Sequence, residues 1–214
     1  MRVLKRKVNT VIRKACVEDG LTHYLKIIFD RVLFAVFYRH LYKRVFSHYG
    51  KNVRWGKHGH FKIIPKSIRV EGTSKIHLSD NVRIDDFVYL QANTNGEGIY
   101  IGHNSRLNAN VHIQAFSKIH IGNHVLIAPF SHINSGNHSF NRTDLPIMYQ
   151  SHTGSGPITI NDGSWLGHST TILGNTYLSE NSVVGANTLV KGQYFNTSIH
   201  VGCRSRQIAV ENGR

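Results

Sequence analysis

Residues 158–190 read ITINDGSWLGHSTTILGNTYLSENSVVGANTLV, and this stretch decides the fold. An aliphatic residue recurs in it at every sixth position: Ile160, Leu166, Ile172, Leu178, Val184 and Val190. The period is not helical, because 3.6 residues per turn would carry position i+6 well off the face of position i. Extended positions i and i+2 share a face, so this period suits a short strand followed by a corner. Such repeats indicate a β-helix, in which the chain winds as a coil of short parallel strands.

The same ladder continues toward the N-terminus in groups of three rungs. The earlier rungs are Leu78, Ile84, Leu90, Ile101, Leu107, Ile113, Ile121, Ile127 and Ile133. Interruptions occur around Thr94–Gly98, in a two-residue slip before Ile121, and at residues 134–157, and each of them follows a third rung. We therefore predict a mainly β fold of about five three-sided coils of about eighteen residues each, with every insert leaving from the same corner of the prism.

Basic charge is concentrated at the start of the chain. The 214 residues carry a formal net charge of +14, and residues 1–57 hold fourteen Lys and Arg against three acidic residues, a net +11. Apolar and basic side chains in this part recur at helical spacing, which predicts a basic amphipathic helical arm. The arm either lies on an anionic membrane, where each Lys or Arg contributes about 1 kcal/mol, or packs on the β-helix with solvated basic faces. We expect no nucleic-acid partner, since no recognition motif accompanies the charge.

These features predict three parts of the chain: the arm at 1–57, a β-helix domain at 58–208 with a loop insert at 134–157, and a tail at 209–214. Cys16 and Cys203 lie far apart in sequence, and we expect two free thiols in a reducing compartment. No apolar signal segment follows the basic start, and no uncharged apolar stretch approaches the roughly 20 residues that span a bilayer. We expect a cytoplasmic protein, with peripheral contact at the inner face of the membrane left open.

The insert at 134–157 is the first place to look for chemistry, because long loops in compact folds are usually functional or disordered. It contains His138. Histidine is the side chain whose unperturbed pKa, about 6.5, suits a general base at neutral pH. The chain has 15 histidines, so a loop histidine by itself is weak evidence.

Two segments resemble the hexapeptide-repeat acyltransferases: IGNHVLIAPFSHINSGNHSF at 121–140 and the stretch at 158–190. The similarity is greatest to the O-acetyltransferases of the maltose/galactoside and surface-polysaccharide branch, and it covers about residues 70–208. The resemblance implies a left-handed parallel β-helix, a homotrimer with active sites in clefts between subunits, and acetyl-CoA as the donor, with no metal. It implies a sugar or polysaccharide acceptor and transfer of the acetyl group to a hydroxyl, in capsule, exopolysaccharide or lipopolysaccharide biosynthesis.

Residue by residue, the resemblance implies that His138 is the general base and that Asn110 contacts the acceptor. The residues it implies for acetyl-CoA are Trp165, Gly167, His168, Gly185, Ala186, Lys191, Arg204 and Arg206, the last three near the CoA phosphates. Asn110 also suits a corner turn, and Trp165 an aromatic at a coil edge. The run GCRSRQI at 202–208 departs from the family, which usually has a proline there. Asp144 is the acidic residue of the insert that we consider for orienting the His138 ring.

Three alternatives stay open at this point. The first is an N-acetyltransferase acting on a nucleotide-linked amino sugar, because the sequence does not separate amine from hydroxyl acceptors. The second is a zinc enzyme, because His112 and His132 each precede a rung and are expected to stack on adjacent coils, with His138 close in sequence. The third is a non-catalytic β-helix scaffold that its arm docks on a membrane.

Overall fold

The protein is described by a computed structural model that covers residues 49–56 and 68–202, together with the backbone of 206–209. The predicted arm therefore lies outside the described residues, apart from its last few positions, and so does most of the predicted tail. In the described part of the chain, no helix is long and apolar enough to cross a membrane.

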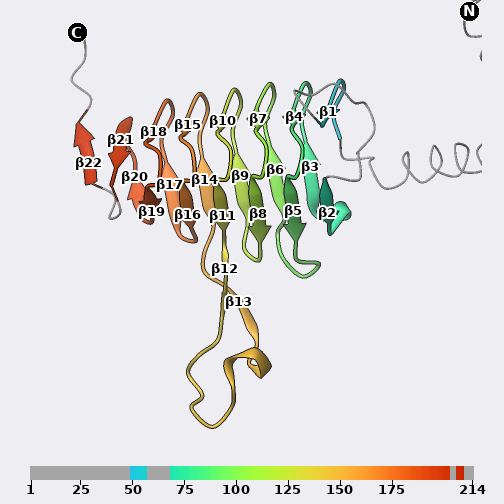
Figure 1. The fold of residues 1–214 in the computed structure, drawn as a ribbon, viewed down its shortest axis with the longest axis vertical. Helices are drawn as coiled ribbons and strands as arrows, with labels where there is room; N and C mark the ends of the chain where they lie inside the picture. Colours follow the sequence, from blue (N-terminus) through green and yellow to red (C-terminus); the bar gives the residue numbers. More distant parts are fainter. Residues whose placement is uncertain (1–48, 57–67, 203–205, 210–214) are drawn as a thin grey trace, which may run out of the picture. The chain divides into compact units, whose positions relative to one another are not determined.

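Three parallel sheets wrap around one core and form a three-sided β-helix (Figure 1). The first sheet contains, in order, β1 (Arg54–Trp55), β4 (Arg83–Ile84), β7 (Arg106–Leu107), β10 (Leu126–Ile127), β15 (Trp165–Leu166), β18 (Val183–Val184), β21 (Ser198–Val201) and the antiparallel β22 (Arg206–Ala209). The second contains β2 (Arg69–Glu71), β5 (Tyr89–Ala92), β8 (His112–Ala115), β11 (His132–Asn134), β16 (Thr171–Leu173) and β19 (Leu189–Val190). The third contains β3 (Ile76–Leu78), β6 (Ile99–Ile101), β9 (Ile119–Ile121), β14 (Ile158–Ile160), β17 (Thr176–Leu178) and β20 (Gln193–Tyr194).

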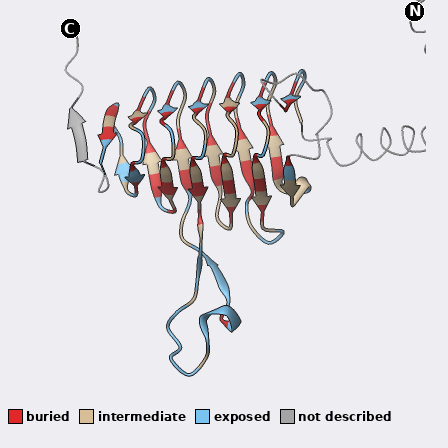
Figure 2. Cartoon of the chain, in the orientation of Figure 1, coloured by how far each residue is buried: buried red, intermediate tan, exposed pale blue. Residues whose placement is uncertain are grey.

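The predicted rungs form the core. All six aliphatic rungs of the opening stretch have a relative exposure of 0%. Each rung stacks in register on those of neighbouring coils, as Ile127 does on Leu107 and on Leu166. Residues between rungs point outward, so buried and partly exposed positions alternate along strands such as β3, β6, β9 and β14 (Figure 2). Many corners place an asparagine in the left-handed backbone region, which its short polar side chain tolerates.

The β-helix has about seven turns, more than the five predicted. One additional coil precedes Leu78 and is built on Trp55 and Val70, whose strands β1 and β2 join the first and second sheets. Another follows Val190 and is built on Tyr194 and His200 in strands β20 and β21. A search for aliphatic residues at every sixth position does not find these coils, because three of these four rungs are not aliphatic.

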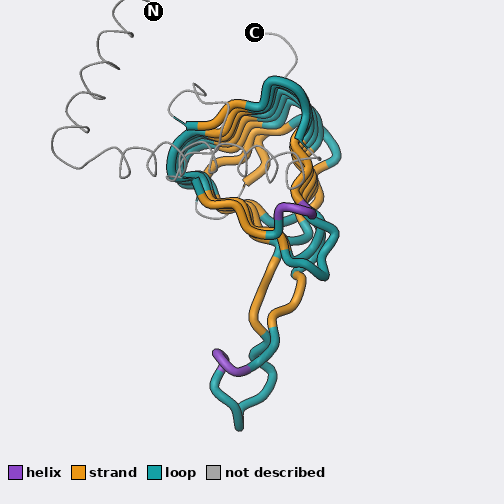
Figure 3. Tube along the Cα trace, turned by 90° about the vertical axis from the view of Figure 1, so that its right-hand side faces the viewer, coloured by secondary structure: helices purple, strands orange, loops and turns teal. Residues whose placement is uncertain are grey.

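The three interruptions noted in the sequence leave from one corner, as predicted, and it lies between the second and third sheets. The connections β5–β6, β8–β9 and β11–β14 all cross this corner, and so does the short 3-10 helix η2 (Thr73–Lys75). The long connection from β1, which ends at Trp55, to β2, which begins at Arg69, instead crosses the corner between the first and second sheets. The long insert forms a hairpin of β12 (Gly136–His138) and β13 (His152–Gly154), with a second 3-10 helix, η3 (Ile147–Tyr149), near its tip. The hairpin is narrow and projects away from the prism (Figures 1 and 3).

Candidate active site

The hairpin is anchored where it leaves the β-helix. The Ser135 hydroxyl is fully buried; it donates to the Ser117 carbonyl at 2.7 Å and accepts from the Phe116 and Ser117 N–H groups at 3.1 Å. Gly136 and Gly154 face each other across the two strands. A Cβ on Gly136 would stand 2.3 Å from the Phe116 ring, and one on Gly154 would stand 2.2 Å from Ser117 Oγ. The absence of side chains at these two positions therefore lets the hairpin base seat against the coil below.

His138 lies at the end of β12 with its side chain exposed. It is paired across the hairpin with His152, and the two ring centroids are 3.9 Å apart at an interplanar angle of 53°. The His152 ring stacks in turn on Phe116, at 5.6 Å and 15°. The rings of Phe116, His152 and His138 thus form a continuous series of contacts that begins at the β-helix. These contacts position His138, although it is exposed and lies on a projecting hairpin.

Asp144 does not orient His138. Its carboxylate accepts two hydrogen bonds from the Arg142 guanidinium, which lower the pKa of Asp144. The neighbouring Gln150 side chain is buried and donates to the carbonyls of Arg142 and Leu145, both at 2.8 Å. The acidic residue therefore helps to shape the hairpin tip, and the group in contact with the His138 ring is a second histidine. Sequence reasoning missed His152, although its place in the same insert was visible.

Asn110 occupies a corner between the first and second sheets, with φ of 60°. Its N–H donates to the Asp86 carbonyl at 3.1 Å, which is the bonding of a corner-turn residue. The hairpin with His138 leaves from another corner, between the second and third sheets. Within one chain the structure therefore does not bring Asn110 and His138 together.

The residues that the resemblance implies for acetyl-CoA lie mostly on two stacked coils. Trp165 is on the outer surface of the first sheet and is 49% exposed. Beyond it the His168 ring packs on Phe130, with centroids 5.3 Å apart. On the next coil, Gly185 is half-buried and Ala186 is exposed. A Cβ on Gly167 would lie 2.7 Å from the Ala186 nitrogen, so packing of the next coil accounts for that glycine.

The three cations proposed for the CoA phosphates are not brought together in the described residues. Lys191 is exposed and follows β19, at the corner between the second and third sheets. Arg204 lies outside the described residues. Arg206 begins β22, whose backbone pairs with Val201 of β21, and its side chain also lies outside the description.

His138 and Trp165 stand on different sides of the prism. The hairpin projects from the corner between the second and third sheets, whereas Trp165 points outward from the first sheet, which lies opposite that corner (Figure 3). Within one chain the structure therefore does not bring His138 and Trp165 together.

Two stacked histidines, His112 and His132, lie on the outer side of the second sheet with centroids 5.0 Å apart. The Nε2 atoms of both are buried and lack a hydrogen-bond partner in the described part of the chain, and burial lowers both pKa values. Among the described residues, no group of three or more His, Cys, Asp and Glu side chains is arranged to hold a metal ion.

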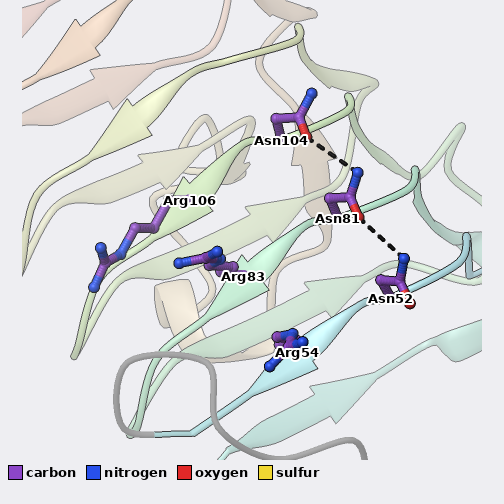
Figure 4. Close-up of a pocket in the computed structure, with 6 residues that line it drawn as sticks. All are labelled: Asn52, Arg54, Asn81, Arg83, Asn104 and Arg106. Atoms are coloured by element: carbon purple, nitrogen blue, oxygen red, sulfur yellow. Dashed lines mark hydrogen bonds between the residues drawn. The ribbon is translucent and has the colours of Figure 1, made fainter.

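A row of three arginines was also missed from the sequence. Arg54, Arg83 and Arg106 lie in register on the outer surface of the first sheet, in strands β1, β4 and β7. Beside them runs a row of asparagines, and the two rows line a pocket of about 400 Å³ (Figure 4). The signal was present, since each arginine stands one residue before a rung on the same side of the prism.

Comparison with known proteins identifies relatives of this chain in sequence. No protein-family model matches the chain. WbbJ of Escherichia coli K12, provisionally named a lipopolysaccharide biosynthesis O-acetyl transferase, is 26% identical over 211 residues, which cover 94% of this chain and 95% of WbbJ. The galactoside O-acetyltransferase of the same organism is 28% identical over 141 residues, 64% of each chain.

Two solved structures share the fold. AntD, an N-acyltransferase from Bacillus cereus solved with dTDP and 3-hydroxybutyryl-CoA, has a TM-score of 0.63 and 24% identity, covering 79% of this chain and 86% of its own. A hexapeptide-repeat acetyltransferase of Vibrio cholerae, solved with acetyl coenzyme A, has a TM-score of 0.51 and 21% identity, covering 80% and 74%.

The fold is therefore that of the hexapeptide-repeat acyltransferases. Within that class, the relatives in sequence include a galactoside O-acetyltransferase and WbbJ, which confirms the predicted resemblance.

Proposed function

We propose that this protein is an acetyl-CoA-dependent O-acetyltransferase that modifies a sugar hydroxyl of a cell-envelope polysaccharide or its precursor. The observation that carries the proposal is the match to WbbJ along nearly the whole of both chains. The net charge of +11 in residues 1–57 supports an acceptor presented at an anionic membrane surface.

In the proposed reaction His138 is the general base. The imidazole takes the proton of the acceptor hydroxyl while the oxygen attacks the thioester carbonyl carbon of acetyl-CoA. The C–O bond forms, the C–S bond breaks, and the proton held by the imidazolium passes to the departing CoA thiolate. The products are an acetyl ester and CoA. An exposed position on a projecting hairpin supports this role, because the ring can reach a substrate held on another surface.

The donor would be held by a neighbouring copy of the chain, along the coils that carry Trp165, His168 and Ala186. Because these residues and His138 lie on different sides of one chain, the proposal includes a homo-oligomer, and the family resemblance favours a trimer. A cleft between two copies would also exclude water from the thioester.

Acetyl transfer by the His138→Ala variant tests the mechanism. A positioned base typically contributes about 10²- to 10⁴-fold, so we expect kcat to fall by that factor while acetyl-CoA binding persists. The matched control is His103→Ala, since His103 is an exposed histidine on the corner between the third and first sheets.

Activity of His138→Ala within a few-fold of the parent would show that His138 is not the base. Release of the acetyl group from the product by mild alkali would identify an ester, whereas a stable product would point to the N-acetyltransferase alternative.

A further inference from the structure

The arginine row places like charges directly over one another. Parallel strands are about 4.8 Å apart, so Arg54, Arg83 and Arg106 follow each other at that spacing along the first sheet. Like charges on directly facing positions of neighbouring strands repel each other. Such an arrangement is therefore stabilised when an anion binds across it.

Only one arginine of the row has an acidic partner in the described part of the chain. Asp85, which is nearly buried, lies 3.4 Å from an Nη atom of Arg106. The contact is incomplete, because Asp85 Oδ1 and Arg106 Nε are both buried and have no hydrogen-bond partner among the described residues. Arg54 and Arg83 are exposed and form no ion pair there. The row therefore retains a net positive charge.

The opposite wall of the pocket is neutral and internally hydrogen-bonded. Asn52 donates to Asn81 at 3.3 Å, and Asn81 donates to Asn104 at 3.2 Å, so the side-chain amides form a continuous row (Figure 4). All three have φ near 60°, which fixes the corners on which they stand. The pocket thus offers guanidinium groups on one side and amides on the other along three successive coils.

We propose that the arginine row binds the diphosphate group of an acceptor whose sugar is carried on a nucleoside diphosphate or a polyprenyl diphosphate. A guanidinium group can donate two parallel hydrogen bonds to phosphate oxygens. Two arginines on adjacent strands therefore suit two linked phosphoryl groups better than one isolated oxyanion. This inference rests on the proposed function, since it names the chemical class of the acceptor.

The position of the row supports this assignment. Along the outer surface of the first sheet, Arg106 is followed by Leu126 and then by Trp165, both of them exposed. The two steps from Arg106 to Trp165 span roughly 10 Å. An acceptor held by its phosphates on Arg83 and Arg106 would extend its sugar over Leu126 toward the coil proposed for acetyl-CoA.

Titration calorimetry of the full-length protein with inorganic pyrophosphate tests the proposal. Hydrogen bonds to a charged group are strong enough that Arg83→Gln should weaken binding about tenfold or more, and Arg83→Lys should lie between that variant and the parent. The matched control is Arg69→Gln, which removes the same charge from the second sheet. In the Arg69→Gln variant, Glu71 loses its ion pair with Arg69 but still accepts hydrogen bonds from Tyr89 and Gln91, so its carboxylate keeps polar partners. Thermal unfolding of each variant confirms that it is folded.

Equal pyrophosphate affinities for Arg83→Gln and Arg69→Gln would overturn the proposal, as would the absence of saturable binding. Displacement of pyrophosphate by CoA would assign the row to the donor and would likewise overturn it. UDP and vesicles containing a polyprenyl diphosphate, titrated separately, distinguish the two carriers. Acetyl-CoA binding and acetyl transfer by the parent protein are measured in parallel. Their persistence without pyrophosphate binding would reject the arginine site alone, and their absence would reject the proposed function.

Discussion

The contact between His138 and His152 gives His152 a positioning role at the scale of single residues. We expect His152→Ala to lower kcat about 10- to 100-fold with little change in the KM for acetyl-CoA, because misplacing a reacting group is costly. His152→Phe keeps a ring stacked between Phe116 and His138, and it should restore most of the activity. Steady-state kinetics of both variants check this. Loss of all activity in His152→Ala together with an active His138→Ala would instead make His152 the base.

The sequence predicts His138 as a candidate base, but it does not predict which groups surround the imidazole ring. Resemblance to a family supplied the histidine, whereas the ring beside it depends on how the hairpin strands pair. Proximity in sequence favours Asp144 as the orienting group, but Arg142, two residues away, binds its carboxylate. Register across a hairpin and competition among nearby charges are properties of the folded chain, which a list of candidate residue types does not contain.

At the scale of elements, the rungs hold the coils together. Ile172 on β16 is fully buried, and Ile172→Ala should lower the free energy of unfolding by about 2–5 kcal/mol through the lost contacts and the cavity left behind. Thr171→Ala, the neighbour whose side chain points outward, should change it by no more than about 0.5 kcal/mol. Denaturant titration measures both. Similar values for the two variants would contradict the inward position of Ile172.

The coils and the corner used by the inserts could be predicted because the period of the rungs and the phase of the interruptions are both written in the sequence. The terminal coils could not. Trp55 and His200 occupy rung positions in these coils and are fully buried. Neither residue is aliphatic, so a pattern based on aliphatic residues does not identify these positions. His200 is accommodated by a hydrogen bond with Ser198 at 2.8 Å, a solution that only the packed structure reveals.

At the scale of the whole molecule, partly and fully buried histidines make stability depend on pH. Burial lowers the pKa values of His112, His120, His132 and His200 below the ordinary 6.5. The unfolded chain therefore takes up protons first as the pH falls. The free energy of unfolding should be nearly constant above about pH 7, decline as the pH falls through 6.5, and level off below the native pKa values.

Denaturant titrations between pH 8 and pH 5 check this dependence. The double variant His112→Gln, His132→Gln should show a shallower decline than the parent. An unchanged slope in the double variant would show that these two histidines do not contribute to it.

The last strand of the first sheet has a consequence for how copies of the protein associate. A parallel coil ends in open strand edges, which invite another copy to continue the winding and so to build a fibre. In this chain β22 turns back and runs antiparallel to β21. The direction of the first sheet is thereby reversed at its last position, and a second molecule cannot extend that sheet as a further coil in register. One short reversal thus opposes end-to-end polymerisation along the first sheet.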